Sequence, residues 1–185
     1  MQSRGEGAYL RARKAHMTTR LVYYGNPTLR QVAKEIETVD QRHIELIESM
    51  FNTMYKAGGI GLAAPQVNHG ERIIVIDLEY YKGPSLALIN PVITERSREV
   101  EPYEEGCLSV PGIMADIIRP VEISVNAISQ EGEELSFDAD GLLARVIQHE
   151  VDHLDGILFI DYLEDFTRKE LTAELKKIKK LNKAS

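Results

Sequence analysis

Two histidines one helical turn apart constrain this chain more than any other feature of its sequence. His149 and His153 stand four positions apart, so on a helix they project from the same face and can hold one cation between them. Glu150 follows the first histidine, where its carboxylate can act as a general base. This H-E-x-x-H arrangement occurs in metal-dependent hydrolases, although it also arises by chance on surface helices that bind no metal.

The residues around the motif predict where its helix begins and ends. Asp140-Gly141 is typical of a helix start, and Gly156 is typical of a helix end. Apolar residues at helical spacing between them predict a stripe that faces the core. The stripe consists of Leu142, Leu143, Val146, Ile147 and Leu154.

The composition is that of one globular domain. The chain has 185 residues, of which 43% are hydrophobic and 28% are charged. Its formal net charge of -7 argues against sequence-independent binding of nucleic acid over the whole surface, so we predict no direct DNA binding. No apolar run reaches the roughly 20 residues that cross a bilayer, so we predict no membrane association.

Cys107 is the single cysteine, so an internal disulfide is impossible. This favours an intracellular protein. A single thiol either fills space in a core or serves as a reactive or metal-binding group.

The remaining pattern indicates an α+β fold. A helix is predicted over 39–56, and the strands cluster around the few helices without a repeating strand–helix–strand order. The last two strands form a hairpin that leads into the helix of His149. The predicted strands are 72–78, 85–93 with an interruption at Asn90-Pro91, 121–125 and 135–137.

The two ends of the chain are both basic. Residues 1–17 have no apolar periodicity, and we interpret them as a disordered leader or a remnant of cloning, with a short organellar targeting segment as the alternative. A helix is predicted over 167–180, with Leu171, Leu175 and Ile178 on one stripe. Its lysines are either a solvated face or a docking surface for an acidic partner such as RNA.

A catalytic site of the zinc type needs three protein ligands and one open position for water. The helix supplies two ligands, and the candidates for the third are Cys107, Glu164 and Glu170. A second region of interest is the glycine- and alanine-rich segment 58–67, which indicates close approach of backbone to a ligand or to another segment. It follows a helix and precedes a strand, which is the reverse of the order in a dinucleotide-binding loop.

Three segments of the chain together suggest a family. They are Gly59-Ile60-Gly61-Leu62-Ala63-Ala64-Pro65-Gln66, Glu105-Gly106-Cys107-Leu108-Ser109 and Gln148-His149-Glu150-Val151-Asp152-His153-Leu154-Asp155-Gly156. In this order and with these separations they resemble the three signature motifs of the peptide deformylases. The resemblance runs from about residue 18 to residue 163. It implies antiparallel strands packed around a central helix that carries H-E-x-x-H, with a C-terminal helix behind them.

The resemblance also implies a reaction and a cofactor. The expected activity is hydrolysis of the formyl group from N-formylmethionine on newly synthesised polypeptides, with release of formate. Cys107, His149 and His153 are expected to bind one divalent metal ion per chain. Fe²⁺ is expected natively, and Zn²⁺, Ni²⁺ or Co²⁺ can replace it.

The family pattern assigns further roles residue by residue. Glu150 is expected to be the general acid and base, and the Gln66 side-chain amide and the Leu108 backbone N–H are expected to stabilise the oxyanion. The substrate backbone is expected to pair with Ile60, Gly61 and Gly106 as an added strand. Leu142 and Val146 are expected to wall the methionine pocket. Arg145 and Met114 stand at positions where family members differ.

The expected organisation is a catalytic domain over 18–165 and a C-terminal helix and tail over 166–185. The expected compartment is the bacterial cytoplasm, or an organelle if residues 1–17 are a targeting segment. Ribosome contact through the basic C-terminal helix is a further hypothesis. The alternatives are a peptidase that cuts internal bonds with a different third ligand, a catalytically silent ribosome-associated protein, and a purely structural metal site.

Overall fold

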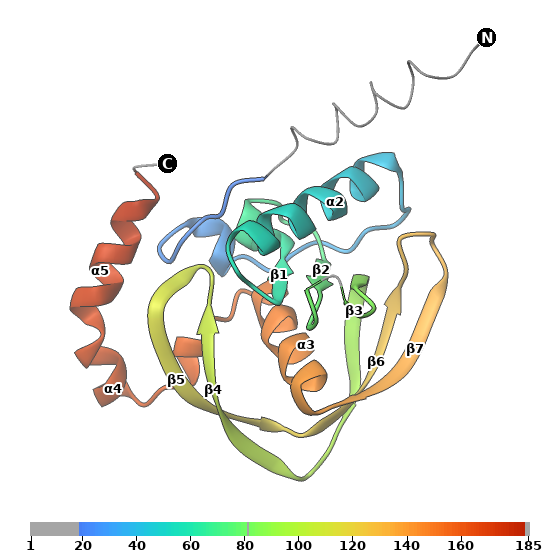
Figure 1. Cartoon of the computed structure of the whole chain (residues 1–185). Helices are drawn as coiled ribbons and strands as arrows, with labels where there is room; N and C mark the ends of the chain where they lie inside the picture. The colour runs from blue at the N-terminus through green and yellow to red at the C-terminus, as the bar shows by residue number, and fades with distance from the viewer. Residues whose placement is uncertain (1–18, 81, 184–185) are drawn as a thin grey trace.

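The helix that carries the two histidines lies at the centre of the fold, between strands on either side of it (Figure 1). This helix, α3, spans Gly141–Leu154. The computed structural model describes residues 19–80 and 82–183. The leader predicted over 1–17 lies outside the described residues. The predicted α+β class, with antiparallel strands around the histidine helix, is confirmed.

Five strands form an antiparallel sheet in the order β1-β2-β3-β6-β7. The predicted hairpin before α3 is present as β6 and β7. The predicted interruption at Asn90 is a bulge, because this residue has φ 50° and the strand continues to Arg96. The strands are β1 (Gly61–Ala63), β2 (Ile73–Ile76), β3 (Leu86–Arg96), β6 (Glu122–Ile128) and β7 (Glu134–Asp140).

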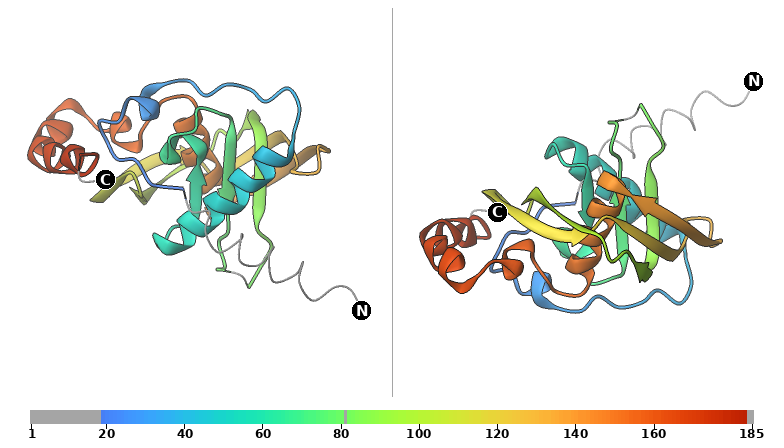
Figure 2. Two further views of the ribbon diagram at one scale, coloured as in Figure 1. Left: turned by 90° about the horizontal axis from the view of Figure 1, so that it is seen from above. Right: turned by 90° about the horizontal axis from the view of Figure 1, so that it is seen from below.

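Helices cover both faces of this sheet (Figure 2). In β2, Ile74 and Ile76 pack in one apolar cluster with α3, whereas Ile73 and Val75 pack in another with helix α2 (Gln41–Lys56). Because side chains alternate along a strand, a fully apolar strand is expected when both faces are covered. Helix α2 confirms the helix predicted over 39–56, and its N-terminus is capped by the Asp40 side chain.

A second sheet of two strands was not predicted. It consists of β4 (Val100–Cys107) and β5 (Val110–Pro120), which form an antiparallel hairpin. Most side chains of β4 are exposed, so the strand lacks the apolar alternation that would have revealed it. The hairpin closes tightly, with Cys107 opposite Val110, and this places the single cysteine at its tip.

The bounds of α3 agree with the prediction, but one residue of its apolar stripe does not. The helix begins after Asp140 and ends before Gly156, whose φ of 74° requires the left-handed conformation that glycine favours. Leu142 is 43% exposed, so its assignment to the core was wrong. It lies in the first turn of the helix, where it lines a cavity.

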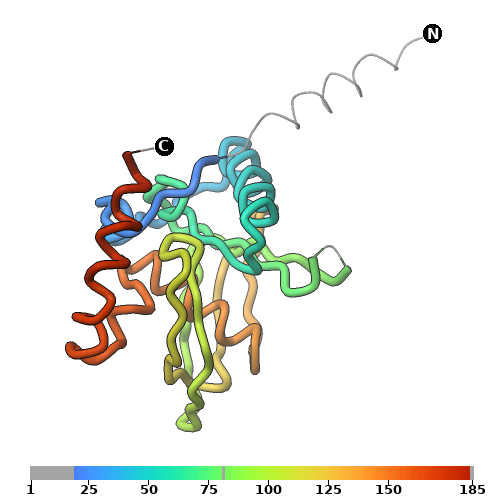
Figure 3. The backbone as a smooth tube through the Cα atoms, turned by 60° about the vertical axis from the view of Figure 1, so that its left-hand side comes forward, coloured from blue at the N-terminus to red at the C-terminus, as the bar shows by residue number. Residues whose placement is uncertain are grey.

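The C-terminal segment forms two short helices where one was predicted. They are α4 (Asp165–Glu170) and α5 (Thr172–Leu181), which meet at Leu171. Leu175 and Ile178 are buried against residues of β5, as their spacing predicted. Figure 3 shows these helices beside the β4–β5 hairpin. The division into a domain over 18–165 and a tail over 166–185 stays a prediction.

None of the helices within residues 19–80 and 82–183 has the length and apolar character needed to cross a membrane.

Candidate active site

The hairpin tip and the central helix bring together three side chains that could hold a metal ion, and we call this group the metal-binding cluster. One ligand atom from each of Cys107, His149 and His153 lies within 4.8 Å of the other two. The Cys107 Sγ is 3.2 Å from the His153 Nε2. Glu164 and Glu170 do not belong to this cluster, so the cysteine is the third candidate ligand that the fold provides.

A buried carboxylate fixes the orientation of His149. The Glu105 Oε2 lies 2.9 Å from the His149 Nδ1. Burial raises the pKa of Glu105, but hydrogen bonds from His149 and Arg119 outweigh it and lower the pKa to about 2. An ionised carboxylate can only accept hydrogen bonds, so Nδ1 carries the proton and the Nε2 lone pair remains for a metal.

Two buried arginines hold this carboxylate in turn. Arg119 donates to both oxygens of Glu105, at 2.6 and 3.0 Å, and a third donor of Arg119 reaches Asp152 at 2.8 Å. Arg145 donates to Glu105 at 3.0 Å and to the backbone carbonyls of Ile117 and Glu101 at 2.6 and 2.8 Å. These ion pairs therefore join α3 to the β4–β5 hairpin directly behind the metal-binding cluster.

The Glu105→Gln variant is expected to lose both stability and metal affinity. Removal of the charge leaves two buried guanidinium groups undercompensated, which should lower the free energy of unfolding by about 3–5 kcal/mol. The loss of the fixed His149 orientation should weaken metal binding by about 10–100-fold. Denaturant titration and competition with metal buffers measure the two effects. The control is Glu101→Gln, which changes an exposed side chain on the same strand.

A folded Glu105→Gln variant with normal metal affinity would contradict the role of Glu105.

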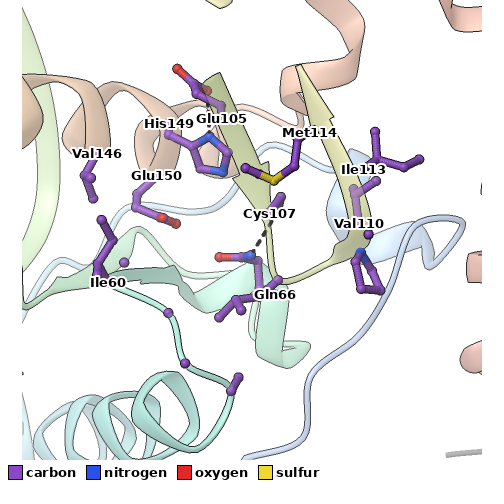
Figure 4. A pocket seen from close by; sticks show the side chains of 18 of the residues that line it. Ile60, Gln66, Glu105, Cys107, Val110, Ile113, Met114, Val146, His149 and Glu150 are labelled. Carbon is purple, nitrogen blue, oxygen red and sulfur yellow. Dashed lines mark hydrogen bonds and ion pairs between the residues drawn. The ribbon is translucent and has the colours of Figure 1, made fainter. Parts of the chain in front are cut away.

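Glu150 is buried, and its side chain lies near Cys107 and His149 (Figure 4). The side chain is 4% exposed, and its Oε2 has no hydrogen-bond partner among the described residues. Burial raises the pKa of Glu150 to about 7. A carboxyl group with a pKa near neutrality can take up and release a proton during a reaction at neutral pH.

Gly61 allows this carboxylate to lie close to β1. A Cβ atom at Gly61 would stand 2.5 Å from the Glu150 Oε1 and 2.8 Å from a methyl group of Val146. The predicted close approach of backbone in the glycine-rich segment is therefore confirmed at this position. The segment it approaches is α3.

The amide of Gln66 has a fixed orientation. Its Oε1 accepts a hydrogen bond from the Ala63 N–H at 2.8 Å, so its Nε2 must point the other way. Nε2 lies 3.5 Å from the Cys107 Sγ and 3.3 Å from the Ser109 Oγ. The 3₁₀ helix Ala64–Val67 thus holds an N–H donor next to the metal-binding cluster.

One cavity of about 810 Å³ contains nearly all the predicted site residues (Figure 4). Gln66, Cys107, His149 and Glu150 line it, whereas His153 is buried and is not among the lining residues. The residues predicted to bind substrate or to stabilise the oxyanion all line the cavity. These are Ile60, Gly61, Gln66, Gly106, Leu108, Leu142 and Val146.

The sequence did not reveal the supporting roles of Glu105, Arg119, Arg145 and Asp152. Glu105 belongs to one of the three recognised segments, which is the only signal that pointed to it. Arg119 follows two isoleucines, and Arg145 stands within the apolar pattern of α3. A charged residue embedded in apolar sequence indicates a buried ion pair but does not identify its partner.

Comparison with known proteins identifies the family of this chain. The family described as polypeptide deformylase matches residues 18–169. A peptide deformylase from Prochlorococcus marinus is 50% identical over 151 residues, covering 80% of this chain and 74% of the relative. The corresponding protein from Azotobacter vinelandii is 46% identical over 157 residues, covering 85% of this chain and 94% of the relative.

Solved structures give the same result for the fold. A peptide deformylase from Legionella pneumophila superposes with a TM-score of 0.84 at 38% identity, covering 91% of this chain and 99% of the other. A peptide deformylase from Synechococcus elongatus, solved in complex with actinonin, superposes with a TM-score of 0.81 at 45% identity, covering 88% and 89% of the two chains. The chain therefore belongs to the polypeptide deformylase family, a family of metal-dependent enzymes.

Proposed function

We propose that this chain removes the formyl group from N-formylmethionine at the start of newly synthesised polypeptides and releases formate. The proposal depends mainly on one observation. Cys107 and His149 line one cavity with Glu150 and Gln66, and His153 completes their group of candidate metal ligands. This set provides a metal site, a proton acceptor and an oxyanion donor within one pocket. Membership of the deformylase family supports the same reaction.

The donor set fits a divalent metal ion. One thiolate and two imidazoles suit Fe²⁺, Zn²⁺, Ni²⁺ and Co²⁺, and three protein ligands leave a coordination position for water. Burial lowers the pKa of His153 well below its usual range, which favours the neutral imidazole that a metal requires. We infer one ion per chain, held by Cys107, His149 and His153, with Fe²⁺ as the native metal. When bound, it supplies Lewis-acid chemistry that acidifies water and polarises a carbonyl.

The side chains around the site can carry the protons and the developing charge. Glu150 accepts a proton from the water that adds to the formyl carbon, and it delivers a proton to the amine as the carbon–nitrogen bond breaks. The Gln66 Nε2 and the backbone N–H of Leu108 donate hydrogen bonds to the formyl oxygen as it becomes negatively charged. The products are formate and a peptide with a free amino terminus.

The cavity walls suit an extended peptide. Ile60 directly precedes β1, Gly61 begins it, and Gly106 lies in β4, so a substrate strand between them would pair with backbone on both sides. Such pairing recognises the main chain without selecting a sequence. Leu142 and Val146 then offer an apolar wall for the methionine side chain.

The products of a reaction with an N-formylmethionyl peptide test this proposal against the alternative of an internal peptidase. We expect formate and the full-length peptide with a free amino terminus. Mass spectrometry identifies both products in one sample. Fragments cleaved within the peptide, without formate, would contradict the proposal.

Iron as the native metal predicts sensitivity to oxygen. A ferrous ion held by a thiolate should be oxidised in air, so activity should decay several-fold faster in air than under anaerobic conditions. Replacement of the metal by Ni²⁺ should remove the difference. Equal half-lives of the protein purified without air, measured in both atmospheres, would count against iron.

We propose that the enzyme reaches its substrates by contact between helix α5 and the ribosome. The helix end carries Lys176, Lys177, Lys179, Lys180 and Lys183, all exposed. The variant with Lys176→Glu and Lys180→Glu is expected to co-sediment with ribosomes several-fold less, and binding should weaken with salt. The matched control is Lys34→Glu with Lys56→Glu, on other surfaces. Salt-insensitive or absent co-sedimentation of the unaltered chain would contradict the proposal.

The proposed compartment is the bacterial cytoplasm, where formylated nascent chains emerge. If residues 1–17 direct the protein to an organelle, the same reaction takes place there.

A further inference from the structure

We propose that Met114 is a reversible oxidation site, at which a hydroperoxide converts the thioether to a sulfoxide and so lowers the affinity of the cleft for formylated peptides. The effect on affinity rests on the proposed function, because it concerns the same cleft. The oxidation itself does not, because it depends only on the position and exposure of one sulfur atom. Met114 belongs to none of the recognised segments and takes no part in the proposed reaction.

Met114 differs in exposure from the other methionines within residues 19–80 and 82–183. It lies on strand β5 and is 56% exposed, whereas Met50 and Met54 are fully buried in the core beside α2. A dissolved oxidant reaches an exposed thioether far more readily than a buried one. A peroxide is therefore expected to modify Met114 and to leave the two buried methionines as internal references.

The sulfur of Met114 lies over Gly106, on the wall of the cleft. The two residues stand directly opposite each other in the β4–β5 hairpin, so they share one face of it. Glycine leaves the space above its backbone empty, and the thioether fills that space. A Cβ atom at Gly106 would overlap the Met114 Sδ and would lie 3.1 Å from its methyl carbon. Figure 4 shows Met114 extending from β5 toward β4, and both residues line the catalytic cavity.

This position links the oxidation state of the sulfur to substrate binding. Gly106 is proposed to pair with the backbone of the substrate, so a bound peptide would pass next to the Met114 thioether. The unmodified thioether is apolar and adaptable, and it needs no hydrogen bond. A sulfoxide adds an oxygen that is solvated in the empty cleft and must give up water when the peptide covers it. That desolvation weakens peptide binding.

The modification is an oxygen transfer that involves two electrons. A lone pair of the Met114 sulfur attacks the terminal oxygen of the hydroperoxide, and the new S–O bond forms as the O–O bond breaks. The proton of that oxygen passes to the departing oxygen, which leaves as water or an alcohol. The sulfur is oxidised and the peroxide is reduced. A methionine sulfoxide reductase reverses the change: it removes the oxygen as water while its dithiol becomes a disulfide.

The other oxidisable sulfur of the cleft predicts a different result. Cys107 is a ligand of the proposed metal site, so its oxidation would release metal and lower kcat. Oxidation of Met114 leaves all three proposed ligands intact. The KM should therefore rise while kcat and bound metal stay unchanged. Metal content and the kinetic constant that changes thus distinguish the two sulfurs.

The test treats the full chain with hydrogen peroxide until mass spectrometry shows one added oxygen on the peptide that contains Met114. The chain is loaded with Ni²⁺, because iron itself reacts with peroxide. We expect the KM for an N-formylmethionyl peptide to rise by about tenfold, with Met50 and Met54 unmodified. Methionine sulfoxide reductases for both epimers, with a dithiol, should restore the original KM.

The matched control is Met114→Leu, which keeps an apolar side chain of similar volume without a sulfur. The same treatment should leave the KM of this variant as it was before treatment. A second measurement uses Glu150→Gln, in which turnover should be largely lost. A saturating N-formylmethionyl peptide should slow the oxidation of Met114 in that chain several-fold, because the bound peptide covers the sulfur.

The outcomes separate failure of the oxidation site from failure of the proposed function. Oxidation of Met114 without a change in KM would overturn the proposal, as would an equal rise in KM in treated Met114→Leu. Loss of metal and of kcat, with KM unchanged, would assign the sensitivity to Cys107 and would also overturn it. Equal oxidation rates with and without peptide would contradict the position of the sulfur beside the substrate. No formate from the untreated chain would contradict the proposed function itself.

Discussion

The Glu150→Gln variant is expected to keep its metal and to lose turnover by about 10²–10⁴-fold. Glutamine has nearly the same shape as glutamate, so the buried position should remain filled. It cannot accept the proton of the attacking water or return one to the leaving amine. The measurement is kcat for formate release, with bound metal counted on the same sample.

Glu164→Gln is the matched control for this variant. Glu164 is an exposed carboxylate that the sequence allowed as a third metal ligand, and it lies outside the metal-binding cluster. Its substitution should change neither turnover nor metal content. Full activity in Glu150→Gln would exclude Glu150 as the general base, and metal loss in Glu164→Gln would contradict the assigned ligand set.

The Cys107→Ala variant is expected to lose metal and, with it, activity. The thiolate is the one anionic ligand in the proposed set, so its removal should weaken metal binding by more than the roughly 10–100-fold that loss of a supporting residue costs. Competition with metal buffers measures the affinity, and formate release measures the consequence. Thermal unfolding of the metal-free proteins is the control for the fold. The unfolding temperatures of the variant and of the unaltered chain should differ little, because alanine fits the space of the cysteine side chain.

The same variant separates the two hydrolase hypotheses. An internal peptidase with a different third ligand would keep both metal and activity without Cys107. If Cys107→Ala kept both its metal and its activity, the proposed metal site would be contradicted.

The parts of the fold that repeat a local pattern could be predicted from sequence. Helix α3 and the β6–β7 hairpin follow from apolar periodicity and turn residues, which act over a few neighbouring positions. Leu142 was misassigned because periodicity gives the face of a helix but not the end at which a cavity opens. The β4–β5 hairpin escaped prediction because its exposed residues and its prolines at 102, 111 and 120 conceal any strand pattern.

The residues that support the site could not be predicted, because they meet across long separations in sequence. Arg119 and Arg145 reach Glu105 from 14 and 40 positions away. Asn182 contacts Tyr23 from 159 positions away. No local pattern encodes such pairs, whereas the candidate metal ligands could be proposed because three short segments of the sequence resemble the motifs of one family.

Formate release as a function of bound metal tests most directly whether this chain is a metal-dependent deformylase. The chain, purified without air, is stripped with a chelator and titrated with Fe²⁺ while formate from an N-formylmethionyl peptide is measured. We expect no release from the stripped chain and a rate that rises in proportion to bound metal until one ion is bound per chain. A chain that binds one ion and releases no formate would contradict this expectation.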